Sequence, residues 1–201
     1  MLTFTNSLKI CLLSERCNSL EELKKRITDK NYKAITLNDN TLNDKDLLYL
    51  QSLMYLEDLS IAATDITGSC LKDLLHIPGL RKLDISCNES LNLQVTLEVL
   101  TEHLPQTHLA ELDLSGNPFD CISLVLLIST AFSCAHKGFK RLALGNLEHL
   151  EHTQIDLLHQ AIQSQTASNP VIIDSPTLRA YEEYLFNPQN MKQLKNPQKP
   201  S

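Results

Sequence analysis

A pair of apolar residues separated by one residue recurs seven times along the 201-residue chain. The first members of the pairs are Ile10, Ile35, Leu59, Leu83, Leu112, Leu142 and Val171. Successive pairs are 24 to 30 residues apart, which leaves room for one short strand and one returning segment. A nearly constant spacing of this size indicates stacked units that share one core. No other feature of the sequence restricts the fold as strongly.

A second feature recurs three positions after the pair in units two to five. The residues there are Asn40, Thr64, Asn88 and Asn117. Where the chain leaves a strand, its backbone N–H and C=O groups lose their sheet partners, and such groups are costly to bury unpaired. An amide side chain carries both donors and acceptors. We therefore expect the four side chains to form a structural ladder between neighbouring units, with no catalytic part.

The segments LRKLDISCN and LAELDLSGNPF combine both features and resemble the leucine-rich repeat L-x-x-L-x-L-x-x-N-x-L. The resemblance implies an α/β leucine-rich-repeat solenoid of about seven turns, a horseshoe with parallel strands on its concave face and helices on its convex face. It implies an N-terminal capping turn (1–31), repeats (32–168) and a C-terminal capping turn (169–186). The last segment (187–201) has three prolines and little apolar content, which predicts a disordered polar tail. A doubly wound α/β domain is the alternative fold, but it does not explain the asparagines.

Several segments between the strands have helical patterns. Ser19 followed by Glu22 predicts the start of one helix. Thr153 is expected to cap a later helix, and Ser175 followed by Pro176 predicts the start of the last one. The apolar run from Cys121 to Phe132 is expected to be a buried helix.

Composition restricts the classes of partner and compartment. Eighteen basic against 24 acidic residues give a net charge of −6 without a basic cluster, so we expect no nucleic acid partner. No apolar run reaches the roughly 18 residues of a membrane span, and the first residues lack a secretory pattern. The six cysteines include no C-x-x-C pair, which predicts free buried thiols in a reducing compartment. The expected location is therefore cytoplasmic.

Residues that could support catalysis are sparse. His149 and His152 stand three apart, and on a helix they would share one side, but they lack a third ligand and the H-E-x-x-H pattern. The sequence contains no glycine-rich phosphate loop and no local cysteine–histidine signature. We therefore expect no catalytic residue, no metal ligand and no cofactor.

The residues that flank the apolar pairs are expected to face outward from the strands and to bind a partner. The predicted binding residues are Asp58, Ser60, Lys82, Asp84, Ser86, Glu111, Asp113, Ser115 and Arg141. Carboxylates outnumber cations in this set, which favours a basic helix or loop of a protein partner bound by a monomer. The alternative is that these acids only keep an exposed sheet soluble.

Short leucine-rich-repeat proteins that intracellular bacteria such as Legionella and Coxiella deliver into host cells are similar to this chain in their irregular turns and few glycines. The resemblance implies a non-catalytic virulence effector that is secreted into the host cytoplasm and binds a host protein there. Two other functions remain open. The 29- and 30-residue units suggest a cytosolic adaptor similar to ribonuclease inhibitor, and His149 and His152 leave room for an enzyme with an unrecognised site.

Overall fold

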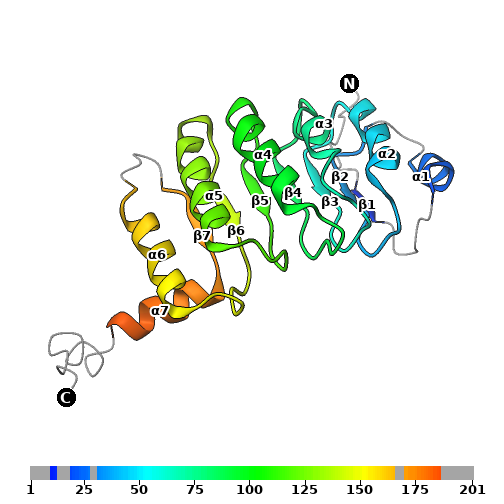
Figure 1. Ribbon diagram of the computed structural model, residues 1–201. Coiled ribbons are helices and arrows are strands. Elements are labelled where there is room, and N and C mark those ends of the chain that lie inside the picture. The colour runs from blue at the N-terminus through cyan, green and yellow to red at the C-terminus, as the bar shows by residue number, and fades with distance from the viewer. Residues whose placement is uncertain (1–9, 13–18, 28–30, 166–169, 187–201) are drawn as a thin grey trace, which may run out of the picture.

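The computed structural model of the protein describes residues 10–12, 19–27, 31–165 and 170–186. Within these ranges, seven three-residue strands form one sheet in which all neighbours are parallel and strand order follows chain order (Figure 1). The strands are β1 (Ile10–Leu12), β2 (Ala34–Thr36), β3 (Asp58–Ser60), β4 (Lys82–Asp84), β5 (Glu111–Asp113), β6 (Arg141–Ala143) and β7 (Ile172–Asp174).

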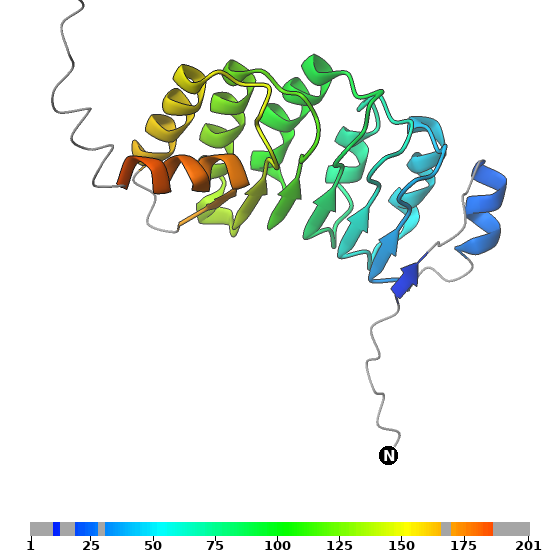
Figure 2. The ribbon, with the colours of Figure 1, turned by 90° about the horizontal axis from the view of Figure 1, so that it is seen from below.

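The segments that connect the strands contain helices of unequal length. The α-helices are α1 (Leu20–Arg26), α2 (Asp44–Leu47), α3 (Leu71–Leu75), α4 (Leu93–His103), α5 (Cys121–Ser133), α6 (His152–Gln163) and α7 (Pro176–Phe186). Short 3-10 helices are η1 (Leu48–Ser52), η2 (Leu104–Gln106) and η3 (Ala135–Lys137). The connections from β3 to β7 run along one face of the sheet (Figure 2). We call the other face the open face.

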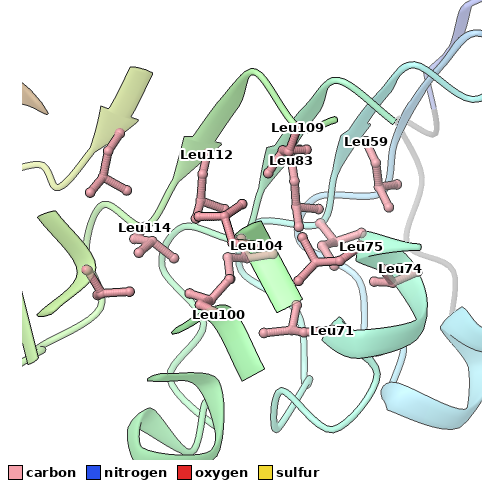
Figure 3. Packing of buried hydrophobic residues seen from close by; sticks show 14 of the residues in the cluster. Leu59, Leu71, Leu74, Leu75, Leu83, Leu100, Leu104, Leu109, Leu112 and Leu114 are labelled. Carbon is pink, nitrogen blue, oxygen red and sulfur yellow. The ribbon is translucent and has the colours of Figure 1, made fainter. Parts of the chain in front are cut away.

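The core lies between the sheet and the connecting helices. The middle residues of the central strands are buried and stand in register across the sheet, among them Leu59, Leu83 and Leu112. They belong to one apolar cluster with helix residues such as Leu74 and Leu100 (Figure 3). Each fully buried leucine stabilises the fold by about 1.5–3 kcal/mol, so the stacked units depend on one another for their stability.

The four polar corner residues lie inside this core. Asn40, Thr64, Asn88 and Asn117 are between 2% and 6% exposed. Asn117 donates from Nδ2 to the carbonyls of Leu114 and Ile85, both at 3.0 Å, and its Oδ1 accepts the backbone N–H of Asn88 at 3.0 Å. Asn88 Oδ1 in turn accepts the backbone N–H and the hydroxyl of Thr64, both at 2.8 Å. These bonds connect the corners of three successive units.

Two of the predicted helix starts are confirmed and one is wrong. Ser19 accepts the N–H of Glu22 at the start of α1, and Ser175 precedes Pro176 at the start of α7. The helix α6 begins two residues before the position that a Thr153 cap implies, because Glu151 and Gln154 form a capping box there.

The expectation of a buried helix over Cys121–Phe132 is wrong in part. The helix α5 forms over Cys121–Ser133, and Asp120 caps it by accepting the N–H of Ser123 at 2.7 Å. However, Ile122 is 74% exposed and Leu126 is 46% exposed. A helix that packs on one face of a sheet can bury only the side that faces the core.

The terminal units are shifted relative to the predicted repeat. Cys11 pairs with Ile35, although the repeat places Ile10 there. At the other end Ile173 pairs with Leu142, where the repeat places Val171. Within the described residues each end strand pairs on one side only, so its register depends on a single neighbour and the apolar pattern constrains it less.

The predicted fold class needs a correction. The α/β class is confirmed. The predicted leucine-rich-repeat horseshoe, with a concave strand face and a convex helix face, is wrong. The description that replaces it is coarser: one parallel sheet whose strands alternate with helices. The connecting helices range from four residues in α2 to 13 in α5. A spacing of 24 to 30 residues predicts strand–crossover alternation, which many α/β folds share, and therefore does not identify a family.

Candidate functional site

The register of the sheet arranges the open face in two rows. The first row contains the first residue of each strand from β2 to β7, in the order Ala34, Asp58, Lys82, Glu111, Arg141 and Ile172. The second row contains the third residue of each of these strands, in the order Thr36, Ser60, Asp84, Asp113, Ala143 and Asp174. The two rows differ in their charge pattern, which decides what the face can attract.

Charges of opposite sign alternate along the first row and partly neutralise one another. Lys82 Nζ lies 3.0 Å from Glu111 Oε1. Arg141, the next residue of this row, pairs with Asp174 of the second row. Cross-strand pairs of opposite charge stabilise a sheet modestly, so much of this row serves the sheet itself.

The second row carries two neighbouring carboxylates without a cation. Asp84 and Asp113 are register partners on β4 and β5, and no ion pair within the described part of the chain includes either one. Each accepts the backbone N–H of the residue two positions on, Ser86 at 3.0 Å and Ser115 at 2.9 Å. Asp84 also accepts the hydroxyl of Ser60 at 2.7 Å. Like charges on adjacent strands repel, so a cation supplied from outside would stabilise this pair.

A shallow hollow of about 210 Å³ lies at the centre of the open face. Its charged lining residues are Asp58, Lys82, Asp84, Glu111, Asp113 and Arg141. Four carboxylates against two cations leave a net charge of −2 in the hollow. The structure therefore brings together six of the nine predicted binding residues. Ser60, Ser86 and Ser115 are half-buried and are not part of the lining.

Asp58 on β3 lies at one end of this group. Burial raises the pKa of its carboxyl, Lys82 opposes the rise, and the carboxylates of Glu111 and Asp84 add to it. The negative charge on Asp58 is thus disfavoured by its surroundings, and a positive group placed beside it would relieve that cost.

Sequence reasoning missed the neutralisation of Arg141. Asp174 pairs with Arg141 and also with Arg179 of α7, whose Nη2 lies 3.3 Å from Asp174 Oδ1. The predicted repeat placed Pro170 and Ile172 beside the β6 residues, because it aligned Val171 with Leu142. The acidic partner on β7 could have been found only with the register that the structure gives.

The residues considered for catalysis do not converge. His149 precedes α6 and its Nε2 lies 2.8 Å from the carbonyl of Phe119. His152 begins α6, and its ring stacks edge-on against Tyr181 at 5.0 Å between centroids. Since His149 is outside the helix, the two imidazoles do not share a helix face. No group of three or more histidine, cysteine or acidic residues in the described ranges could hold a metal ion.

Three buried thiols are poor nucleophiles in these surroundings. Cys70, Cys121 and Cys134 are free and buried, and burial raises the pKa of each thiol. A thiol must ionise to attack an electrophile. Cys87 departs from the expectation of buried thiols because it is exposed, and Cys11 and Cys17 lie outside the residues whose side chains are described.

No helix among the described residues is both long enough and apolar enough to cross a membrane.

Comparison with known proteins gives little guidance. No protein-family model matches the chain, and no curated protein matches it. One solved structure that it is similar to is the arginine decarboxylase of Paramecium bursaria Chlorella virus, with 13% sequence identity and a TM-score of 0.28. The match covers 81% of this chain and 51% of the decarboxylase, so the chain spans about half the length of that protein. A likeness this low supports no inference about activity.

The comparison also gives no support to the leucine-rich-repeat assignment, because no family model matches the chain. The description that stands is the α/β class with a single parallel sheet.

Proposed function

We propose that the chain is a non-catalytic protein-interaction module that binds a basic helix or loop of a protein partner on its open face. The observation that carries the proposal is the pair Asp84 and Asp113, neither of which forms an ion pair within the described residues, in a hollow with a net charge of −2. Charge complementarity of this kind sets orientation and association rate more than affinity.

The shape of the hollow favours a protein side chain over a small metabolite. Metabolite sites are usually enclosed, mostly apolar and about 300–1,000 Å³ in volume, whereas this hollow measures about 210 Å³ and is lined mainly by charged groups. Two cationic groups would balance its net charge. Lysine or arginine residues one turn apart on a helix present two such groups on one side.

Affinity capture from a cell lysate tests the proposal, with the wild-type chain beside an Asp84→Arg, Asp113→Arg double variant. The double variant changes the charge of the hollow from −2 to +2 and should lose at least nine-tenths of the captured partner, as measured by quantitative mass spectrometry. A basic partner then meets repulsion where it met attraction.

A matched control carries the same charge change on the helix side of the molecule. Asp73 on α3 and Glu98 on α4 are both exposed and lie off the open face. An Asp73→Arg, Glu98→Arg variant should capture the partner as the wild type does. Circular dichroism verifies that each variant is folded. If all three chains capture the partner equally, the partner does not bind at the open face.

The finer predictions of function depend on the source of the partner. Secretion into a host cell as a virulence effector predicts that the captured partner is a host protein, whereas a ribonuclease-inhibitor-like adaptor predicts a partner from the same cytosol. Capture from both lysates, host and source organism, separates these two possibilities. An enzyme with an unrecognised site predicts neither partner.

A further inference from the structure

Another hollow lies between the start of α6 and the helix α7 (Figure 1). Its volume is about 470 Å³, which is within the usual range of about 300–1,000 Å³ for small-molecule sites. Leu150, His152 and Ile155 line it from the side of α6, and Tyr181 and Tyr184 line it from α7. We call this hollow the aromatic pocket. It shares no lining residue with the acidic hollow of the open face.

Three aromatic rings of the pocket lie close together. The centroid of the His152 ring is 5.0 Å from that of Tyr181 and 5.9 Å from that of Tyr184, and the ring planes meet at 69° and 82°. The two tyrosine rings are 6.4 Å apart and nearly parallel, at 27°. A ligand that fills the pocket therefore contacts three rings. The face of an aromatic ring has a negative potential, which attracts a cation within about 6 Å of the centroid.

Hydrogen bonds hold the walls of the pocket in place. The Thr177 hydroxyl accepts the N–H of Leu147 at 2.9 Å, which fixes the start of α7 to the loop before α6. The Tyr181 hydroxyl donates to Asp156 Oδ1 at 3.1 Å, and Tyr181 is 8% exposed. The pocket is therefore formed in the free protein, and a ligand does not have to order its walls on binding.

The surroundings of the pocket are acidic. Residues 146–186 contain six carboxylates against one cation, Arg179, which gives a net charge of −5 with histidine neutral. Arg179 pairs with Asp174 at 3.3 Å. Glu151 precedes α6 and places a negative charge at the positive end of that helix. The electrostatic field at the pocket therefore favours a cation over an anion.

We infer that the aromatic pocket binds a small organic cation whose charge is a trimethylammonium group. A primary ammonium needs acceptors for its three N–H groups, and none of the described lining residues is a carboxylate. A trimethylammonium group has no N–H. Its methyl groups can pack against Leu150 and Ile155 while the rings and the surrounding carboxylates balance its charge. This inference does not rest on the proposed function of the open face.

Titration of the full chain with choline, followed by NMR, tests the inference, and 3,3-dimethyl-1-butanol is the neutral probe of the same shape. The titration is done at pH 8, because a protonated imidazole would oppose a cation. Choline should bind at least fivefold more tightly than the alcohol, since only the cation is attracted to the ring faces. Equal binding of the two probes overturns the inference, as does the absence of saturable choline binding up to about 20 mM.

Two substitutions of Tyr184 test the role of the rings. Tyr184→Phe keeps the ring and should bind choline within about twofold of the wild type, whereas Tyr184→Leu should bind it at least fivefold more weakly. The matched control is Tyr55→Leu, because Tyr55 is 62% exposed and lies outside the aromatic pocket. It should bind choline as the wild type does. Thermal unfolding verifies that each variant is folded, and wild-type binding by Tyr184→Leu contradicts the inference.

A third probe, N-acetyl-trimethyllysine methylamide, tests whether the ligand is a free molecule or a modified protein. It presents the same trimethylammonium group on a peptide unit. If it binds no more tightly than choline, the peptide unit makes no contact with the protein and a free cation is supported. Binding at least tenfold tighter than that of choline overturns the assignment to a small molecule.

Discussion

At the scale of single residues, the buried amide of Asn117 holds two units together. Its side chain supplies the acceptor for the backbone N–H of Asn88, and this N–H lies in the core, away from water. Replacement of Asn117 by alanine leaves that donor unpaired. We expect the free energy of unfolding to fall by about 1–3 kcal/mol, measured by urea denaturation.

Asn146 offers a control for this substitution because its side chain is exposed. Asn146→Ala should change the free energy of unfolding by less than about 0.5 kcal/mol, as surface substitutions usually do. If both alanine variants unfold at the same urea concentration, the bonds of Asn117 do not stabilise the corner.

At the scale of elements, one carboxylate joins α2 to the start of α3. Asp44 accepts the N–H and hydroxyl of Thr67 at 2.8 and 2.9 Å, the N–H of Gly68 at 3.1 Å and the N–H of Cys70 at 2.9 Å. Burial raises the pKa of this carboxyl, but the hydrogen bonds from Thr67 and Cys70 outweigh burial and lower the pKa from 3.8 to about 2.

The lowered pKa of Asp44 predicts a pH-dependent contribution to stability. A carboxylate that binds protons less tightly in the folded state stabilises it above the unfolded pKa, and this contribution is lost as the pH falls from about 4 through about 2. Asp44→Asn should therefore cost about 1–2 kcal/mol at pH 7. The difference from the wild type should shrink toward pH 2 in urea titrations at each pH.

The control for Asp44 is Asp65→Asn, because Asp65 is exposed and none of the hydrogen bonds that join α2 to α3 involves its side chain. Its free energy of unfolding should follow that of the wild type at every pH. A constant difference between Asp44→Asn and the wild type from pH 7 to pH 2 would contradict the assignment of the effect to ionisation.

At the scale of the whole molecule, binding of a partner to the open face should depend on salt. Attraction between the acidic hollow and a basic partner is screened when salt rises from about 50 to 500 mM. We therefore expect capture of the partner to weaken, because the hollow carries a net charge of −2.

Quantitative capture at each salt concentration measures this response. Capture that stays constant from about 50 to 500 mM salt would indicate that the partner does not bind through the acidic hollow.

The sequence by itself determined the alternation of strands and crossovers and the central register. Alternating apolar residues such as Leu83 and Leu112 must face one side of a strand, so the outward positions of Asp84 and Asp113 follow directly. The corner positions of Asn88 and Asn117 were also predictable, because buried backbone groups need partners wherever strands end.

Only the tertiary structure decided which charges remain unpaired and which apolar side chains remain exposed. Arg141 is neutralised by Asp174, a residue 33 positions away, and its pairing depends on the register of a terminal strand. Ile122 and Leu126 belong to an apolar run that predicts a buried helix, yet they are exposed because no further layer of the described residues covers α5. The local sequence pattern indicates which residues can share one face of a helix or strand. Whether those side chains are buried or form ion pairs depends on what packs against that face.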